Sequence, residues 1–401
     1  MEIKKIEKQI GVGCADIEEK DKRYVLDVLN TGRLSYGPYS TRLEKQFAAL
    51  HEVNYAQLVN SGTSALRLAV HCLRDAHNWQ AGDEIICPAV TFVASANVIV
   101  MNGLKPVFVD VCPHTYNIDP EKIEAKITEK TRAIMVVNLF GQIAEMDPIL
   151  RLARRYNLKI IEDSCETMFV TYKGKPAGSF GDISCFSTYM AHLITTGVGG
   201  LVCTNNKDYA VKLKSLANHG RDGIYLNIDS DQNLSGLELS EVVSRRFRFT
   251  SLGYSFRLTE MEAALGLGQI ERKDSILLKR KQHAHYLREG LKPLVNYLQL
   301  PWWPFYKEHA FMMFPLVIKP GAGINKKELV MHLEKYNIET RDMLPLINQP
   351  VYKEMFVIEE ADYPIANWIN NNGFYIGCHQ KLTKEELDYI VKVFFDFFKT
   401  K

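Results

Sequence analysis

Residues 131–163 read TRAIMVVNLFGQIAEMDPILRLARRYNLKIIED, two apolar runs separated by a stretch of helical character. The runs TRAIMVVN and KIIED are short and rich in β-branched residues, which is typical of buried strands. The stretch MDPILRLARRYN carries apolar residues at helical spacing, and Asp147 with Pro148 forms a plausible helix start. This order of strand, helix and strand predicts a crossover unit of a parallel sheet.

The same alternation extends outward over residues 55–205. Further apolar runs read AQLV, DEIICP, KPVFVD, GDISCFS and GGLVCT, and helical stretches such as SALRLAVHCLRDA separate them. The pattern predicts an α/β domain with a mostly parallel sheet and helices on both faces. In such a domain we expect the ligand site beyond the carboxyl ends of the strands.

The chain after Arg257 has a different organisation. The stretch LTEMEAALGLGQIERKDSILLKRKQHAHYLREGL predicts a long bridging helix that is partly broken at Gly266 and Gly268. Beyond it, FMMFPLVI, YNIETR and GFYIG predict strands, while INKKELVMHLEKY and TKEELDYIVKVFFDFFKT predict helices. We therefore expect a large domain over residues 1–260 and a small α+β domain over residues 261–401. The polar segment Arg221–Arg248 is the expected long loop.

Composition excludes several classes of protein. The 401 residues include 49 basic and 47 acidic side chains, so no strong field favours nucleic acid or an anionic membrane. The chain shows neither a signal peptide nor about 18 unbroken apolar residues, and we expect a cytoplasmic enzyme without a membrane partner. The 8 cysteines are scattered, which predicts reduced, packed thiols and no metal site.

The segment VNSGTSALRLAV is the first candidate for a binding site. A strand is expected to end at Asn60 and a helix to begin near Thr63. Small residues at such a junction leave backbone N–H groups open to a phosphate, which the helix N-terminus also favours. Serine and threonine are equally ordinary helix caps, so this segment alone leaves both interpretations open.

Two further segments carry groups suited to catalysis. In KIIEDSCETM, Asp163 would lie at the carboxyl edge of the sheet, where a carboxylate can keep a pyridine nitrogen protonated or serve as an ordinary surface or metal-binding acid. In GDISCFSTYMAHLITTGVGGLVCT, His192 follows Ser187 by five residues, so that a hydroxyl and a base can face one ligand. A histidine by itself is more often structural, and the hypothesis depends on the combination.

These motifs occur together in a known order. NSGTSAL, EDSCET, GDISCFS with ITTGVGG, NHGR and GYSFRLTEMEAALGL resemble the DegT-type sugar aminotransferase family, from TGRLSYGPYSTRLEKQF to GCHQKLTKEE. The resemblance implies pyridoxal phosphate (PLP) fold type I, with an aspartate-aminotransferase-like three-layer large domain and a smaller C-terminal domain. It also implies a homodimer with active sites at the subunit interface and a nucleotide-linked keto sugar as substrate.

The resemblance also implies roles for individual residues. Those expected to contact the cofactor are Gly62, Thr63 and Ser187 at its phosphate, with Ser64 beside them, Phe92 on its ring, and Asp163 at its nitrogen. Glu166 stands where the family usually has glutamine, and Ser255 stands where an asparagine of the partner subunit often reaches the phosphate. Val198 replaces an acid of the usual TTGEGG motif, a departure for which the sequence offers no account.

His192 occupies the position of the family's cofactor-binding lysine. Imidazole forms no stable covalent bond to PLP, but it is a general acid and base near neutral pH. PLP or pyridoxamine phosphate (PMP) would therefore be bound non-covalently. Histidine-for-lysine variants of the family, which also carry an acid near position 166, remove the 3-hydroxyl of sugars. We therefore predict a dehydratase that removes the C3 hydroxyl of a nucleotide-linked 4-keto-6-deoxy sugar, with L-glutamate as amino donor and His192 as base.

Two other functions remain open at this point: a sugar aminotransferase of the same family, and an inactive relative that only binds ligand. The nucleotide and the sugar are not encoded in any motif, and whether His192 is native or introduced is equally open. Basic residues in family motifs suit a substrate phosphate, the glutamate carboxylate or a partner chain, and also structural ion pairs. These residues are His219, Arg221, Arg257, Arg341 and His379.

Overall fold

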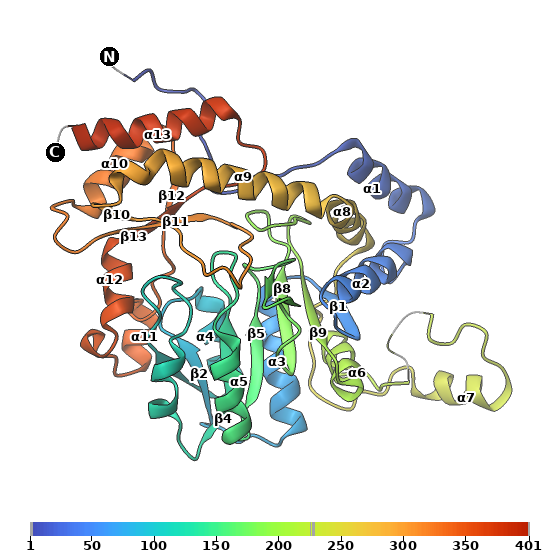
Figure 1. The fold of residues 1–401 in the computed structure, drawn as a ribbon. Helices are drawn as coiled ribbons and strands as arrows, with labels where there is room; N and C mark the ends of the chain where they lie inside the picture. Colours follow the sequence, from blue (N-terminus) through green and yellow to red (C-terminus); the bar gives the residue numbers. More distant parts are fainter. Residues whose placement is uncertain (1–2, 225, 227–228, 400–401) are drawn as a thin grey trace.

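A computed structural model describes residues 3–224, 226 and 229–399 (Figure 1). Its large sheet has seven strands in the order β1-β9-β8-β5-β4-β2-β3. The strands are β1 (Tyr55–Val59), β2 (Glu84–Pro88), β3 (Lys105–Val109), β4 (Thr131–Val137), β5 (Lys159–Asp163), β8 (Ile183–Ser187) and β9 (Gly200–Thr204). β9 runs antiparallel to both neighbours, and all other pairs are parallel. The predicted mostly parallel sheet is confirmed, with one strand for each apolar run.

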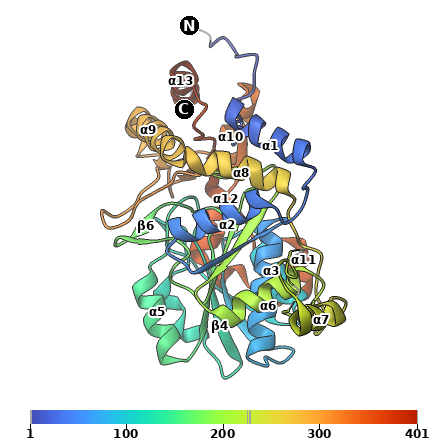
Figure 2. The same ribbon diagram turned by 90° about the vertical axis from the view of Figure 1, so that its right-hand side faces the viewer.

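Helices cover both faces of this sheet. Figure 2 shows α5 (Met146–Arg155) on one side and α3 (Gly62–Ala76) with α6 (Lys207–Ala217) on the other. The predicted crossover helix is α5, which buries Met146, Ile149 and Ala153. The other elements of the large domain are α1 (Glu19–Thr31), α2 (Pro38–Leu50), α4 (Val93–Met101), α7 (Gly236–Arg245), the short pair β6 (Thr171–Tyr172) and β7 (Lys175–Pro176), and 3-10 turns at Pro120–Lys122 and Glu124–Lys126. The large sheet is thus the middle of three layers, with helices on both of its faces.

A second sheet lies in the C-terminal part of the chain. It is antiparallel, in the order β10-β11-β13-β12. The elements are β10 (Leu298–Gln299), β11 (Phe314–Ile318), β12 (Thr340–Asp342), β13 (Gly373–Ile376), α9 (Lys273–Leu291), α10 (Lys326–Lys335), α11 (Pro350–Met355), α12 (Pro364–Asn372) and α13 (Lys384–Lys399), with 3-10 turns at Lys292–Leu294 and Glu360–Asp362. Ile3 and Ile10 from the start of the chain are buried in the core of this unit. The N-terminal segment thus packs with the end of the chain.

The bridging helix differs from the prediction at its glycines. α8 (Glu260–Glu271) continues through Gly266 and Gly268, and it ends at Arg272, directly before α9. A Cβ on Gly266 would lie 2.9 Å from Leu43 Cδ2, and a Cβ on Gly268 would lie 2.0 Å from Asp21 Oδ1. The predicted break was wrong because these glycines serve the close approach of neighbouring helices, which a one-dimensional pattern does not show.

We expect a Gly268→Ala variant to be destabilised by about 2 kcal/mol, because overpacking costs more than the roughly 1 kcal/mol that alanine gains in helix propensity. The added methyl group meets the carboxylate of Asp21, which is 1% exposed and is held by Arg272 Nη2 at 2.7 Å. Urea unfolding followed by circular dichroism measures the change. Lys279→Ala, at an exposed position of α9, is the matched control, and equal stability of the two variants would contradict the argument.

The segment Arg221–Arg248 is only partly a loop. Gly236–Arg245 forms α7, which stands away from the body of the molecule in Figure 1. The NIDSDQNLSG core of the predicted loop includes Asn227 and Ile228, which lie outside the described residues. The helix was missed because LELSEVVSR is short and buries only Val242 among its described residues.

All eight cysteines are free, and five of them are buried. Over residues 3–224, 226 and 229–399, no helix is long and apolar enough to cross a membrane. In the same part of the chain, no group of three or more His, Cys, Asp or Glu side chains is arranged to hold a metal ion.

Candidate active site

A cavity of about 450 Å³ opens at the carboxyl ends of the central strands. Val137, Asp163 and Ser187 are the last residues of β4, β5 and β8, and all three line it. Its other walls come from the N-terminal segment and the C-terminal part of the chain, through Val12, Met312, Met313, Leu344 and Tyr375. The site therefore lies at the carboxyl ends of the strands of the large sheet, as predicted for a parallel arrangement. Residues of the C-terminal part of the chain also line it.

Seven residues singled out in the sequence meet in this cavity. They are Gly62, Thr63, Phe92, Asp163, Glu166, Ser187 and His192. Ser64 lies one residue further along α3 and does not line the cavity: its hydroxyl donates to Asn60 Oδ1 at 2.7 Å, and its backbone N–H donates to the Ser61 hydroxyl at 3.0 Å. Ser61 is thus the helix cap, and Ser64 stabilises the turn rather than facing the cavity.

Asp163 is a buried carboxylate held by uncharged hydrogen-bond donors. Its side chain accepts hydrogen bonds from Ser95 Oγ at 2.7 Å and from the Cys165 backbone N–H at 3.2 Å. Burial raises its pKa, and these hydrogen bonds oppose the shift only in part. No cation of the described residues forms an ion pair with it. The site therefore favours a ligand that brings a positive charge, such as a protonated ring nitrogen, to this carboxylate.

His192 is oriented by its own turn. Its Nδ1 lies 3.1 Å from the Ser187 carbonyl oxygen, which can only accept, so Nδ1 carries the proton and Nε2 is left as the basic nitrogen. Burial lowers the pKa of His192 to about 4, and the charge of Arg280 acts in the same direction. The ring is consequently neutral at physiological pH, with Nε2 able to accept a proton.

Glu166 is the second acid of the cavity. Its Oε2 accepts a hydrogen bond from the Phe140 backbone N–H at 3.1 Å. Burial raises the pKa of Glu166 to about 7, and the neighbouring Asp163 adds to the shift. Tyr375, which faces it from β13, also has a raised pKa, caused by burial and by the charge of Glu166. Glu166 therefore exchanges its proton near neutral pH, which suits an acid or base in a reaction.

A Glu166→Gln variant is expected to be more stable than the parent protein at pH 8, by at most about 3 kcal/mol, and nearly equal to it at pH 4. The folded-state pKa is about 7, against an ordinary value of 4.5. The free energy of unfolding of the parent protein therefore falls as the pH rises from about 4.5 to 7, because the buried Glu166 must ionise. The variant carries an uncharged amide there, so this loss does not occur. Thermal unfolding of cofactor-free protein at both pH values measures this. The exposed Glu354→Gln serves as control, and a pH-independent difference would disprove the assignment.

The end of the cavity formed by α3 and β8 is tightly built. A Cβ on Gly62 would lie 2.8 Å from both Ser187 Cβ and Cys165 Sγ, so only glycine lets the helix start approach these side chains. The helix N-terminus and the Ser187 hydroxyl thus meet, as an anion site requires. Phe92, at the N-cap of α4, is 57% exposed and offers an unshielded ring face on the cavity wall.

The remaining candidates lie outside this cavity. Ser255, Arg257 and His219 are exposed and form their own cluster, in which Arg257 Nη2 donates to Ser255 Oγ at 2.7 Å. Arg221 lies over the rings of Phe247 and Phe249, at 5.4 and 5.5 Å from their centroids. Within the chain, Arg341 pairs with Glu339, and His379 is buried.

The sequence reading missed several residues of the site. Ser95 orders the Asp163 carboxylate, and Thr91 is in turn 2.8 Å from Ser95. Thr91 precedes α4 and Ser95 lies in its first turn, on either side of Phe92, and their spacing of four residues is the signal that could have indicated them. Tyr189 and Tyr375 also line the cavity. Tyr375 comes from a strand some two hundred residues away in sequence, and nothing local indicated it. Val198 lies on the cavity wall, but the structure does not explain why it replaces an acid.

Known proteins resemble this chain in sequence over almost its whole length. Residues 15–395 match the model of the DegT/DnrJ/EryC1/StrS aminotransferase family. The chain belongs to this family. It is 34% identical over 385 residues to the GDP-perosamine synthase of Caulobacter vibrioides, with 96% of each chain covered. It is 33% identical over 402 residues to the dTDP-4-dehydro-2,6-dideoxy-D-glucose 3-dehydratase of Saccharopolyspora spinosa, with coverage of 96% and 85%.

Solved structures of DegT relatives have the same fold. GDP-4-keto-6-deoxymannose-3-dehydratase (ColD) with bound GDP-perosamine superposes with a TM-score of 0.86 at 28% identity, covering 96% of this chain and 100% of that one. A GDP-4-keto-6-deoxymannose-3-dehydratase with a trapped PLP-glutamate geminal diamine gives a TM-score of 0.87 at 26% identity, with the same coverage. The predicted family and the PLP fold type I architecture are confirmed. Both synthases and 3-dehydratases occur among the DegT relatives, so the family alone leaves the net reaction open.

Proposed function

We propose that this chain is a PLP- and PMP-dependent dehydratase that removes the C3 hydroxyl of a nucleotide-linked 4-keto-6-deoxy sugar. One observation carries the proposal: His192 lines the cavity with its Nδ1 engaged by the Ser187 carbonyl, and no lysine is among the described residues that line it. An enzyme without that lysine holds its cofactor non-covalently and depends on another base. The 3-dehydratases among the solved relatives support the same reaction.

The residues of the cavity fit this cofactor. Asp163, which is buried and pairs with no cation of the described residues, suits the protonated pyridine nitrogen. The start of α3 at Gly62 and Thr63, together with Ser187, suits the phosphate, and the exposed ring of Phe92 suits stacking. Bound PLP or PMP supplies an electron sink for carbon chemistry next to an amine, and the protein supplies position and charge.

Two side chains would move protons during the reaction. His192 Nε2 accepts a proton from carbon and returns it, because Nδ1 is already engaged by the Ser187 carbonyl. Glu166, whose pKa of about 7 leaves it partly protonated at neutral pH, would supply the proton that the departing hydroxyl needs. L-Glutamate would serve as amino donor, and the sugar product would lack one oxygen while ammonia is released.

The test begins with purified protein, PLP and L-glutamate, followed by absorption as the aldehyde form of the cofactor becomes the amine form. Candidate GDP-, CDP-, UDP- and dTDP-linked 4-keto-6-deoxy sugars are then added, and free ammonia and sugar mass are measured. Ammonia released in step with a sugar that has lost the C3 oxygen would establish the dehydratase.

A sugar aminotransferase is the second candidate, supported by the 34% identity to a GDP-perosamine synthase. In the same assay it would yield an amino sugar and no ammonia. Cofactor binding with neither product, for all four nucleotides, would instead favour an inactive ligand-binding relative. His192 and Glu166 argue for the dehydratase, because an aminotransfer needs no acid for a leaving hydroxyl.

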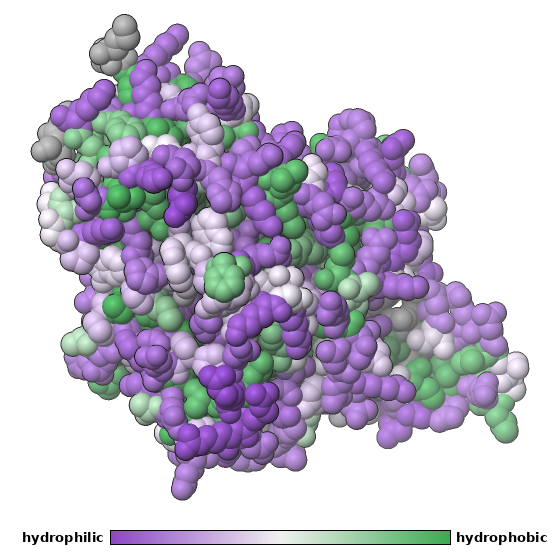
Figure 3. Space-filling view, in the orientation of Figure 1, coloured by the Kyte–Doolittle hydropathy of each residue, from purple (hydrophilic) through white to green (hydrophobic). Residues whose placement is uncertain are grey.

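We further propose that the protein is a homodimer. The arm formed by residues 236–252 carries Leu237, Phe247 and Leu252, which are 90%, 82% and 89% exposed. Figure 3 shows apolar side chains on this projecting part of the molecule. Exposed apolar groups at this density suit a partner surface, and the neighbouring cluster of Ser255, Arg257 and His219 would then reach a partner's site. Sedimentation of the parent protein and of Phe247→Glu tests this, since a dimer should dissociate in the variant.

A further inference from the structure

Arg280 is a buried cation that donates hydrogen bonds mainly to main-chain carbonyl groups. It lies in α9, and its side chain is 1% exposed. The described residues offer it no carboxylate at ion-pair distance. Its guanidinium donates instead to Met312 O at 2.9 Å, Gln380 Oε1 at 3.1 Å, Phe311 O at 3.2 Å and His192 O at 3.3 Å. Burying a charge in this way is costly, so a benefit other than stability is expected.

The four acceptors come from three segments that are remote in sequence. His192 belongs to the turn after β8, Phe311 and Met312 precede β11, and Gln380 follows β13. Met312 lines the same cavity as His192, whereas Arg280 does not. The guanidinium therefore fixes two parts of the cavity wall from behind, without contact with the space that a ligand would fill.

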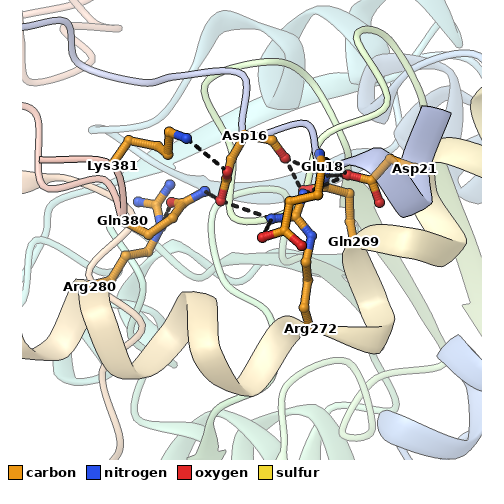
Figure 4. A network of polar contacts seen from close by, with 8 residues as sticks. All are labelled: Asp16, Glu18, Asp21, Gln269, Arg272, Arg280, Gln380 and Lys381. Atoms are coloured by element: carbon orange, nitrogen blue, oxygen red, sulfur yellow. Dashed lines mark hydrogen bonds and ion pairs between the residues drawn. The ribbon is translucent and has the colours of Figure 1, made fainter.

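A polar network extends this anchor to the N-terminal segment. Gln380 Nε2 donates to Asp16 Oδ2 at 3.2 Å, and Asp16 Oδ2 pairs with Arg272 Nη1 at 3.0 Å (Figure 4). The same segment packs on the turn of His192, since a Cβ on Gly13 would lie 2.7 Å from Ala191 Cα. The turn is thus enclosed between α9, the N-terminal segment and β8.

We infer that Arg280 is a positioning residue for His192: it holds the main-chain carbonyl of the base while the Ser187 carbonyl holds the ring. The inference rests on the proposed function, in which Nε2 of His192 moves a proton. With both ends of the residue fixed, Nε2 points into the cavity without reorganisation during the reaction. Besides Arg280, the charged and titratable groups among the described residues that share the cavity with the imidazole are Asp163, Cys165, Glu166, Tyr189 and Tyr375.

Three variants test this inference. Arg280→Met removes the charge and all four hydrogen bonds at similar length, Arg280→Lys keeps the charge but not the planar fork, and Arg288→Met is a partly exposed control in the same helix. Circular dichroism and gel filtration at 15 °C select conditions where all three are folded. We expect kcat for ammonia release to fall about 10- to 100-fold in Arg280→Met, with KM for the sugar changed less than about threefold.

The pH profile and NMR separate positioning from general damage. We expect the acid limb of kcat to move to higher pH in Arg280→Met, because a positive charge near His192 is lost, and to stay in place in Arg280→Lys. Histidine labelled with ¹⁵N, with the His192 signals assigned from a His192→Asn spectrum, reports ring tautomer and titration without any turnover. Folded Arg280→Met with parental kcat and an unchanged His192 titration would overturn the inference. If no sugar is turned over by the parent protein, the proposed function fails, and the ¹⁵N signals still decide whether Arg280 controls His192.

Discussion

A His192→Lys variant is expected to bind PLP covalently, so that borohydride treatment adds the cofactor mass to the chain permanently. The lysine amine would replace the imidazole in the wall of a cavity that contains no other lysine among its described lining residues. The parent protein should lose all of its PLP on denaturation after the same treatment. Mass spectrometry of the intact protein and of its peptides measures the adduct and places it at position 192.

The companion variant His192→Asn tests the base rather than the covalent bond. It should retain PLP, because the residues at the phosphate and nitrogen ends are unchanged, yet release ammonia about 10²- to 10⁴-fold more slowly. His114→Lys, at an exposed position outside the cavity, is the matched control for the covalent adduct. An adduct at position 114, or full activity in His192→Asn, would contradict the role given to His192.

An Asp163→Asn variant is expected to slow the conversion of PLP to PMP by L-glutamate about 10²- to 10³-fold. An amide cannot keep the ring nitrogen protonated, and the ring then no longer accepts charge. A single-turnover absorption measurement with excess glutamate gives the rate without any sugar. Because this step precedes the sugar chemistry, the result is independent of whether the net reaction is dehydration or aminotransfer.

The stability of cofactor-free Asp163→Asn separates chemistry from folding. Burial raises the pKa of Asp163, so the ionised carboxylate lowers the stability of the empty protein at neutral pH. The amide, which keeps the shape and accepts the Ser95 hydrogen bond, should therefore be at least as stable as the parent. Asp182→Asn is the control, since Asp182 lies just before β8, at the opposite end of the strands, and accepts the Ile160 backbone N–H at 2.9 Å. A glutamate reaction slowed equally in both variants would refute a specific role for Asp163.

Much of the large domain could be predicted because short segments of the sequence determine its strands and helices. Each predicted apolar run between residues 55 and 204 forms a strand. Two of these strands end in a polar residue of the site: β5 ends at Asp163, and β8 ends at Ser187. Parallel strands bring such ends to one edge of a sheet, so seven candidate residues meet in one cavity. Their chemical roles came from the family motifs, which the comparison with DegT proteins supports at the level of family and fold.

Predictions failed where the reason for a residue lies in another part of the chain. Gly266 and Gly268 were interpreted as helix breakers, but they lie within α8 and allow the approach of Leu43 and Asp21. α7 was missed because the helix projects and buries only Val242 among its described residues.

The sequence by itself determined the strands and crossover helices, the acid at the end of β5 and the histidine in place of lysine, because strand and helix periodicity and residue chemistry are properties of short segments. Only the tertiary structure decided that β9 runs antiparallel between β1 and β8, that Ile3 and Ile10 enter the C-terminal core, and that Arg280 reaches the carbonyl of His192. Except for the pairing of β8 with β9, these contacts join residues from about ninety to several hundred positions apart. They form only when whole helices and strands pack together, so no pattern within a short segment predicts them.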